Sequence, residues 1–450
     1  MIQQKLVRFR TSLALLLFGG ALVGGLLWSL FAAADSPPQK PQGKHGDASA
    51  EQQLAELQKL KLPQDVTKAP AGLDPVTWAA YIPADNQMTP DRVELGRKLY
   101  FDTRLSHDNS VSCATCHDVT RGFTDRRAVS EGVKNQLGKR NAPTTLNALL
   151  LQSFFWDGRS PSLDNQAKMP ILNPVEMAMP DEAAALKAIR DVPEYQEAFK
   201  KAYGRDMNYE DLGRAIAAFE RTLVFVDSPF RRFLNGDSKA ISADAQAGWE
   251  LFNGKARCAA CHQMNPSNPL GTDNRFHNVG VSARHQNFEA LVQQALKAIE
   301  EGASEKKLDE LAVATDLSEL GRFMVTRNRS EIGSFRTPLI LNIGLTSPYM
   351  HDGSMATLWD VMDHYNKGGE ANPYLDGGIE PLALTEQEID QMVAFLFTLT
   401  DVRFAAENQR QFEAQKAIAK DKKQRPFRDE AMALRKVLPF EGRVMGTQDK

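Results

Sequence analysis

The sequence predicts a mainly α-helical fold made of two related halves. Thr89 and Ser242 each open a helical pattern with an Asp two residues later, and Thr or Ser followed by an acidic first turn is a helix start. The same Gly-x-x-Leu-aromatic spacing follows at 96–100 and 248–252, and each half then reaches a Cys-x-x-Cys-His motif. Because strand signals are few, each half is expected to be one helical domain.

Composition supports a folded chain of more than one domain. The 450 residues are 42% hydrophobic and 25% charged, which is enough apolar material for two or three buried cores and excludes a disordered protein. The formal net charge of -3 gives no strong electrostatic field. Nucleic acid and acidic polymers are therefore not expected as partners.

All four cysteines fall in the two repeated motifs, so none is left for a disulfide. Cys-x-x-Cys-His is the attachment signature of c-type haem: the thiols bond to the porphyrin and the histidine binds the iron. A zinc site or a thioredoxin-like pair would leave both histidines without a role. We therefore predict two covalently bound haem c groups in cytochrome c-like domains, attached through Cys113, Cys116, His117, Cys258, Cys261 and His262.

The N-terminus predicts export to the periplasm, where haem c is attached. Lys5, Arg8 and Arg10 precede an apolar run over 13–34, and the positive residues are expected to stay in the cytoplasm. The length of the run favours an uncleaved anchor in the inner membrane. The three alanines at 32–34 are typical of a signal-peptide cleavage site, so both alternatives stay open.

Changes in pattern divide the rest of the chain. Asn235-Gly236-Asp237 interrupts the helical periodicity between the two halves. A Pro-, Gln- and Lys-rich stretch precedes them, an amphipathic insertion occupies 288–311, and the C-terminal end is rich in charge. The expected organisation is a signal peptide or anchor at 1–34, a linker at 35–75, domains at 76–236 and 237–400, and a charged tail at 401–450.

The region from about residue 91 to 400 resembles the bacterial di-haem cytochrome c peroxidase and MauG family. Six runs occur in the family's order around the two haem motifs, at 95–106, 140–144, 155–159, 173–177, 335–338 and 348–353. The resemblance implies two mostly helical cytochrome domains whose haems face each other across a common interface. It also implies that peroxide reacts at the N-terminal haem, whereas the C-terminal haem stores and relays electrons.

The resemblance further implies roles for particular residues. Glu176 matches the family's acid/base, Gln166 its pocket amide, Pro170 a wall residue and Trp156 the tryptophan between the haems. Judged from the sequence alone, Glu176 would more often be a surface or capping carboxylate, and Trp156 a core anchor.

A calcium ion between the domains is also implied. Its ligands would be the Asn141 side chain with the backbone carbonyls of Asn328 and Ser330, and hard oxygen ligands suit Ca²⁺. The implied partners are hydrogen peroxide and, as electron donor, a small cytochrome c or copper protein. Dimers are usual in the family, which makes a homodimer the expected assembly.

Two positions depart from the family pattern. Val133 stands where peroxidases that need reductive activation carry a loop histidine, which predicts an N-terminal iron that is open to peroxide. Ser347 replaces the methionine ligand of the C-terminal haem. The MauG-like branch uses a tyrosine there, so Tyr349 is the predicted ligand and Met350 the alternative.

Three functions follow as hypotheses. The first is a peroxidase that reduces hydrogen peroxide with electrons that enter at the C-terminal haem. The second is a MauG-like enzyme that oxidises residues of a partner protein through a ferryl haem pair, and the changes at Val133 and Ser347 favour it. The third, a plain electron carrier, would have haems that do not react with peroxide.

Overall fold

A computed structural model describes residues 48–265, 270–285 and 287–437 of the chain. The mainly α class is confirmed, because β1 (Phe276–His277) and β2 (Phe335–Arg336) are the only named strands within these ranges. They pair antiparallel, with Phe276 opposite Arg336. No helix in the described ranges has the length and apolar character needed to cross a membrane. The apolar run predicted at 13–34 lies outside them.

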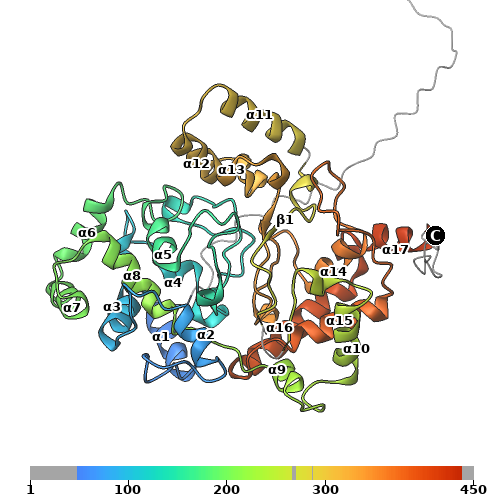
Figure 1. Cartoon of the computed structure of the whole chain (residues 1–450), viewed down its shortest axis with the longest axis horizontal. Helices are drawn as coiled ribbons and strands as arrows, with labels where there is room; N and C mark the ends of the chain where they lie inside the picture. The colour runs from blue at the N-terminus through green and yellow to red at the C-terminus, as the bar shows by residue number, and fades with distance from the viewer. Residues whose placement is uncertain (1–47, 266–269, 286, 438–450) are drawn as a thin grey trace, which may run out of the picture. The chain divides into compact units, whose positions relative to one another are not determined.

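The helices fall into groups along the chain (Figure 1). The first group contains α1 (Ala50–Lys59), α2 (Pro75–Ala80), α3 (Pro90–Tyr100), α4 (Cys113–Cys116), α5 (Leu163–Leu172), α6 (Glu182–Arg190), α7 (Pro193–Tyr203) and α8 (Tyr209–Glu220). The second contains α9 (Pro229–Leu234), α10 (Ala243–Asn253), α14 (Leu358–Asn366), α15 (Glu386–Phe397), α16 (Ala405–Lys420) and α17 (Arg428–Val437). Between them in sequence come α11 (Phe288–Glu300), α12 (Glu305–Ala314) and α13 (Phe323–Thr326).

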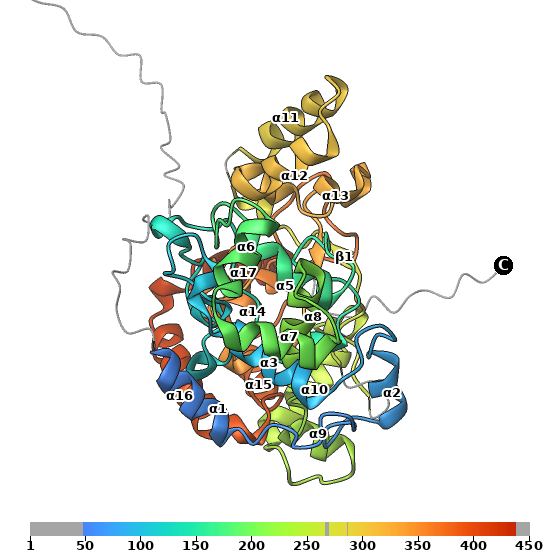
Figure 2. The ribbon, with the colours of Figure 1, turned by 90° about the vertical axis from the view of Figure 1, so that its left-hand side faces the viewer.

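Each of the first two groups has its own hydrophobic core. The first core is built mainly from α3 and α5–α8, and the second mainly from α10 and α14–α16. The predicted insertion forms α11 and part of α12, and these helices pack with α13 around a third, smaller core. Figures 1 and 2 both show α11, α12 and α13 gathered together at the top of the view.

One helix crossing occurs in both halves at the glycine of the repeated signature. A Cβ atom added to Gly96 in α3 would lie 1.8 Å from the Ala215 carbonyl oxygen of α8. A Cβ atom added to Gly248 in α10 would lie 2.0 Å from the Gln391 carbonyl oxygen of α15. Only glycine allows backbones to approach this closely. The repeated spacing therefore marks the point where the helix before each haem motif crosses a later helix.

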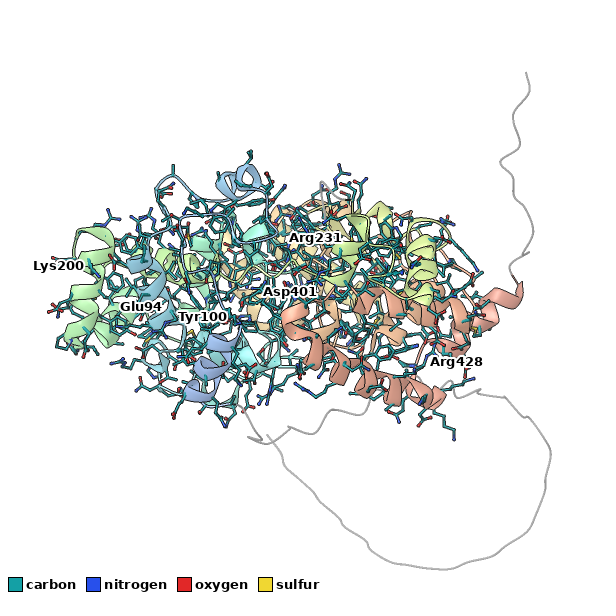
Figure 3. All side chains as sticks on the ribbon, turned by 90° about the horizontal axis from the view of Figure 1, so that it is seen from below. Glu94, Tyr100, Lys200, Arg231, Asp401 and Arg428 are labelled. Carbon is teal, nitrogen blue, oxygen red and sulfur yellow. The ribbon has the colours of Figure 1, made fainter. Side chains whose placement is uncertain are left out.

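A second repeated feature is an asparagine in each half that binds the segment joining the halves. Asn147 and Asn342 both adopt left-handed backbone conformations, with φ of 59° and 63°. Both side-chain amides donate to the Phe225 carbonyl oxygen, over 2.9 and 3.0 Å. Asp401, labelled in Figure 3, donates its backbone N–H to Asn342 Oδ1. The segment that joins the halves is thus held by equivalent residues of each.

Each half also contains one turn that is equivalent to a turn of the other half. We call them the Phe154 turn (154–160) and the Tyr349 turn (349–355). Phe154 forms an antiparallel bridge with Ser160, and Tyr349 forms the same bridge with Met355. In each turn the second residue has positive φ, as does the glycine three residues later. Aligned this way, the aromatic ring of Phe154 corresponds to the phenol of Tyr349.

Two segments differ from the sequence prediction. A linker with one short helix near 51–61 was predicted over 35–75. That helix is α1, but it packs on the first core, and its buried Gln53 donates to the Ala114 carbonyl inside the first haem motif. A surface tail was predicted over 401–450, but α16 and α17 pack on the second core. Arg425 there pairs with Asp363 at 2.7 Å, and both side chains are buried. Sequence periodicity does not show these contacts because the partners are remote in the chain.

Candidate functional site

The first histidine of the haem motifs is held as a neutral iron ligand requires. It follows α4 directly, and its Nδ1 lies 3.4 Å from the Phe123 carbonyl oxygen. The Tyr100 hydroxyl donates to the His117 carbonyl over 3.0 Å. Burial lowers the pKa of His117 to about 4, so the imidazole is neutral at neutral pH. A carbonyl at Nδ1 favours the tautomer with the proton on that nitrogen, which would leave Nε2 available to hold a haem iron.

The second histidine repeats this arrangement. His262 Nδ1 lies 2.7 Å from the Gly271 carbonyl oxygen, and burial lowers the pKa of the imidazole. Gly271 has φ of +64°, and a Cβ atom there would lie 2.6 Å from Ile340 Cγ1. This glycine therefore brings the accepting carbonyl close to the histidine where other residues would be strained.

Each histidine lines a cavity together with at least one cysteine of its own motif. The first cavity includes Cys116 and His117, and the second includes Cys258, Cys261 and His262. The walls are mainly apolar. Thiols beside a neutral imidazole in an apolar cavity are the donor set of a c-type haem, so the residues fit that group.

The first cavity also brings together the residues that the family resemblance singled out for peroxide chemistry. Glu176, Gln166 and Pro170 lie in its wall with His117. Burial raises the pKa of Glu176, an effect opposed by the positive charge of Arg159 and by a hydrogen bond from Asn173. Asn173 Nδ2 donates to Glu176 Oε1 over 2.6 Å. This bond fixes the carboxyl group and leaves Oε2 as the second oxygen for proton transfer.

The loop around Val133 is anchored beside this carboxyl group. The Val133 N–H donates to the Glu176 carbonyl oxygen over 2.9 Å, and the Val133 side chain is fully buried. A Cβ atom at Gly132 would lie 2.1 Å from the Val175 carbonyl oxygen. The loop therefore packs tightly on the segment that carries Glu176, with the apolar side chain of Val133 buried.

Trp156 lies in the wall of both cavities. Its Nε1–H donates to the Asn141 carbonyl oxygen over 2.9 Å, and its own carbonyl accepts the Arg336 N–H over 2.7 Å. The ring also lies edge-on to His351, with centroids 6.5 Å apart. These contacts fix the indole between the two sites.

Arg159 is a candidate site residue that sequence reasoning missed. It lines the first cavity, its guanidinium lies 3.5 Å from the centre of the Phe155 ring, and it pairs with Asp157 at 3.0 Å. Burial alone would raise the pKa of Asp157, but Arg159 and Arg140 hold it below the usual value. The signal was present, because the resembling run 155–159 ends on this arginine.

Glu220 is a second missed residue, and here the sequence held no signal. The side chain is 4% exposed, lines the first cavity, and ends helix α8. Burial raises its pKa to about 8, so the carboxyl group is largely protonated at neutral pH.

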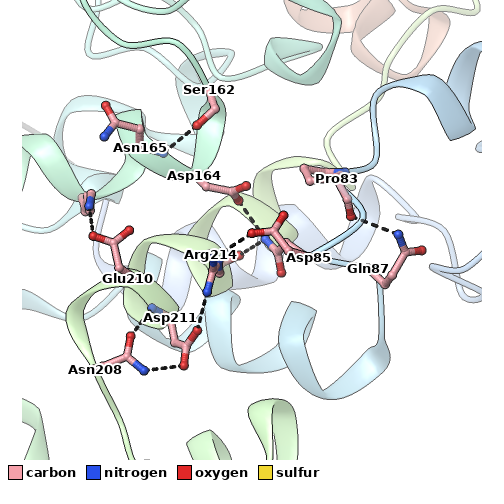
Figure 4. A network of polar contacts seen from close by, with 12 residues as sticks. Pro83, Asp85, Gln87, Ser162, Asp164, Asn165, Asn208, Glu210, Asp211 and Arg214 are labelled. Carbon is pink, nitrogen blue, oxygen red and sulfur yellow. Dashed lines mark hydrogen bonds and ion pairs between the residues drawn. The ribbon is translucent and has the colours of Figure 1, made fainter.

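A polar network fixes α5, the helix that carries Gln166 and Pro170 (Figure 4). The Asn86 side chain donates to Asp164 of α5 over 2.7 Å, and Lys168 of α5 pairs with Glu210 of α8. On α8, Arg214 pairs with Asp85 at 2.7 Å. The wall of the first cavity is therefore tied to α8 and to the segment before α3.

The second cavity contains the predicted axial-ligand candidates. Tyr349 and Met350 both lie in its wall. The Tyr349 hydroxyl donates to the Ile343 carbonyl over 3.1 Å and accepts a bond from Gln415 over 2.9 Å. Burial raises the pKa of Tyr349. His351 also lines this cavity, but its Nε2 is hydrogen-bonded to the buried Glu319 carboxylate, 2.8 Å away.

Each residue of the predicted calcium site takes part in its own hydrogen bonds. Asn141 Nδ2 donates to the Arg127 carbonyl over 2.8 Å. Asn328 and Ser330 are exposed around a 3-10 turn, where the Ser330 N–H donates to Asn328 Oδ1. The oxygen ligands of Ca²⁺ are acceptors that do not bond to one another, so these contacts do not test the site and calcium stays a prediction.

Two haem motifs, two cavities and a shared tryptophan wall define a di-haem c-type cytochrome. Residues 90–239 match the family model described as di-haem cytochrome c peroxidase. The cytochrome-c peroxidase IdrP1 of Denitromonas iodatirespirans is 38% identical over 322 residues, which are 71% of this chain and 84% of the relative. The methylamine utilization protein MauG of Methylorubrum extorquens is 38% identical over 321 residues, or 70% of this chain and 80% of the relative.

A solved structure agrees with these relatives. The MauG-like protein associated with microbial copper homeostasis has a TM-score of 0.58 and 29% identity, and the match covers 76% of this chain and 95% of that one. The chain belongs to the di-haem cytochrome c peroxidase and MauG family. It is therefore an oxidoreductase of the haem peroxidase type with covalently bound haem c.

Proposed function

We propose that the chain reduces hydrogen peroxide to two water molecules at the His117 site. Two electrons from a small cytochrome c or copper protein enter at the His262 site, and two protons complete the reaction. The observation that carries this proposal is the single cavity shared by His117, Glu176, Gln166 and Pro170, with Trp156 in the wall of both cavities.

The haem at each site supplies the iron chemistry of peroxide cleavage and electron storage. Glu176 moves a proton from the inner to the outer peroxide oxygen, and so acts first as base and then as acid. Asn173 holds the carboxyl group through Oε1, and burial raises its pKa. The Gln166 amide, in the same wall, positions the substrate by hydrogen bonding.

Trp156 offers the route for electrons between the sites. An indole is readily oxidised among side chains, and this one contacts the surroundings of both haems. Its hydrogen bond to the Asn141 carbonyl holds the ring in one orientation, which keeps the distance to each site constant.

The test is stopped-flow peroxide turnover with a reduced small cytochrome c as donor. Glu176→Gln is expected to lower the rate by about 10²–10⁴-fold, the usual contribution of a general acid–base group. Glu197→Gln, at an exposed position of α7, is the matched control and should keep the wild-type rate. Equal rates in the two variants would refute the role of Glu176, and peroxide-inert haems would leave a plain electron carrier.

The Val133 loop supports a peroxide site that works without prior reduction. The loop supplies no imidazole to the first cavity, and its backbone is in close contact with the segment that carries Glu176. The oxidised protein is therefore expected to show a high-spin N-terminal haem and to react with peroxide at once. A low-spin bis-histidine spectrum at that haem would contradict this.

Tyr349 is proposed as the second axial ligand of the His262 haem, with Met350 as the alternative. Both line the second cavity, and the hydroxyl of Tyr349 provides a hard anionic ligand once deprotonated. Tyr349→Phe is expected to change the haem spectrum, whereas Met350→Leu should not. The opposite result would assign the ligand to Met350.

A tyrosine ligand favours a second candidate function, oxidation of residues in a partner protein as in MauG. A phenolate stabilises oxidised iron and opposes easy reduction by a donor. This function predicts a long-lived oxidised state after peroxide addition, with slow turnover by reduced cytochrome. Rapid turnover would exclude it as the main activity.

The remaining assignments are proposals about setting and assembly. We place the protein in the periplasm as two haem domains, 76–236 and 237–400, exported by the N-terminal segment and assembled as a homodimer. We also propose a calcium ion between the domains, bound by Asn141, Asn328 and Ser330. Metal analysis before and after chelation tests the ion, and sedimentation of the exported protein tests the dimer.

A further inference from the structure

The Tyr349 hydroxyl is contacted by a residue from far along the chain. Gln415 lies in the middle of α16, and its side chain is 2% exposed. Its Nε2 is 2.9 Å from the Tyr349 hydroxyl oxygen. The sequence of this region predicted only a charged tail.

The orientation of the Gln415 amide is fixed by a second bond. The backbone N–H of Leu358 donates to Gln415 Oε1 over 3.0 Å. Leu358 is the first residue of α14, where backbone N–H groups have no partner within the helix. Because Leu358 N–H can only donate, Oε1 must face it, and Nε2 must therefore face the tyrosine as a donor.

Helix α16 is itself held in place on several sides. Asn408 donates to the Phe397 carbonyl over 3.0 Å, and the Phe412 ring packs edge-on against Phe397 with centroids 5.0 Å apart. Glu407 pairs with Arg126 of the N-terminal half at 2.5 Å. These contacts of α16 hold Gln415 beside the Tyr349 hydroxyl.

We propose that Gln415 is a positioning residue for Tyr349 as the axial ligand of the C-terminal haem, through a hydrogen bond from Nε2 to the phenolate oxygen. This inference rests on the proposed ligation by Tyr349. A hydrogen bond donated to an anionic ligand oxygen draws electron density away from the iron. The bond therefore raises the reduction potential of the C-terminal haem above that of an unassisted tyrosine ligand.

The experiment compares variants of the full-length holoprotein by absorption spectroscopy and redox titration. Gln415→Leu removes the donor, so the phenolate-to-iron absorption band should move to longer wavelength and the potential of that haem should fall. Gln415→Glu keeps an acceptor for Leu358 N–H but can donate to the phenolate only when protonated. Its band should therefore depend on pH in a range where the wild-type band does not.

Two further variants separate the possible failures. Gln409→Glu makes the same substitution at an exposed position of α16 and should leave the band and the potential unchanged. If Tyr349→Phe leaves the spectrum unchanged, both the proposed ligand and this inference are overturned. If Tyr349→Phe abolishes the band while both Gln415 variants keep the wild-type band and potential at full haem content, only the inference about Gln415 is overturned.

Discussion

Replacing Gln53 by alanine should weaken the hold of α1 on the first haem motif. Gln53 Nε2 donates to the Ala114 carbonyl over 3.2 Å, and its Oε1 accepts the Val119 N–H over 3.1 Å. Ala114 and Val119 stand three residues before and two residues after His117, and both are buried. One side chain thus satisfies two backbone groups that flank the iron ligand.

The size of the effect follows from those two bonds. Each buried backbone group left without a partner costs about 1–3 kcal/mol. Releasing the glutamine side chain returns up to about 2 kcal/mol of conformational entropy. The two groups together cost about 2–6 kcal/mol, so after the returned entropy the expected net loss is about 3 kcal/mol. For a domain of this size that corresponds to a fall in melting temperature of roughly 5–15 °C.

Thermal unfolding of the holoprotein, followed by haem absorbance and circular dichroism, measures this loss. Gln58→Ala is the matched control, because it makes the same substitution at an exposed position of the same helix. It should change the melting temperature by no more than a surface substitution does. If the two variants unfold at the same temperature, α1 does not support the haem motif and the reasoning fails.

Three other predictions use the same protein. Trp156→Phe removes the donor to the Asn141 carbonyl and should slow reduction of the peroxide site in stopped-flow experiments, while costing only about 1 kcal/mol of stability; an unchanged rate would exclude the indole as the route. Arg425→Ala strands the buried Asp363 carboxylate and should cost about 3–5 kcal/mol in denaturant titration. Burial raises the pKa of Glu220 from 4.5 in the unfolded chain to about 8 when folded, so the folded state binds an extra proton between these values. Stability should therefore fall as pH rises from about 4.5 to 8, and Glu220→Gln should flatten that dependence.

The sequence predicted the features that depend on local pattern. Both haem motifs, the helix starts at Thr89 and Ser242, and the mainly α class needed only spacing and capping rules. The sequence showed that the glycines at 96 and 248 belong to a repeat, but it did not show why glycine is needed there. Each is the point where another backbone passes, and that backbone belongs to a helix more than 100 residues later.

The features that escaped prediction all depend on partners remote in sequence. Gln53 meets a carbonyl 61 residues away, and Gln415 meets a phenol 66 residues away. Neither residue belongs to a motif, and the composition of their segments indicated only a linker and a charged tail. Glu220 ends an amphipathic helix, and only the folded cavity turns it into a buried acid. Periodicity locates helices, but it does not say which buried polar group they serve.

The equivalence of the Phe154 and Tyr349 turns has a consequence for how two copies of one scaffold came to divide labour. Both turns have the same bridge and the same two positive-φ positions, so Phe154 and Tyr349 occupy equivalent places and differ by one hydroxyl group. Under the proposed ligation, the Tyr349 phenol would hold the C-terminal iron, whereas the Phe154 ring has no ligand atom and would leave the first cavity open to substrate. One difference of side chain at equivalent positions would then accompany the separation of peroxide chemistry from electron storage.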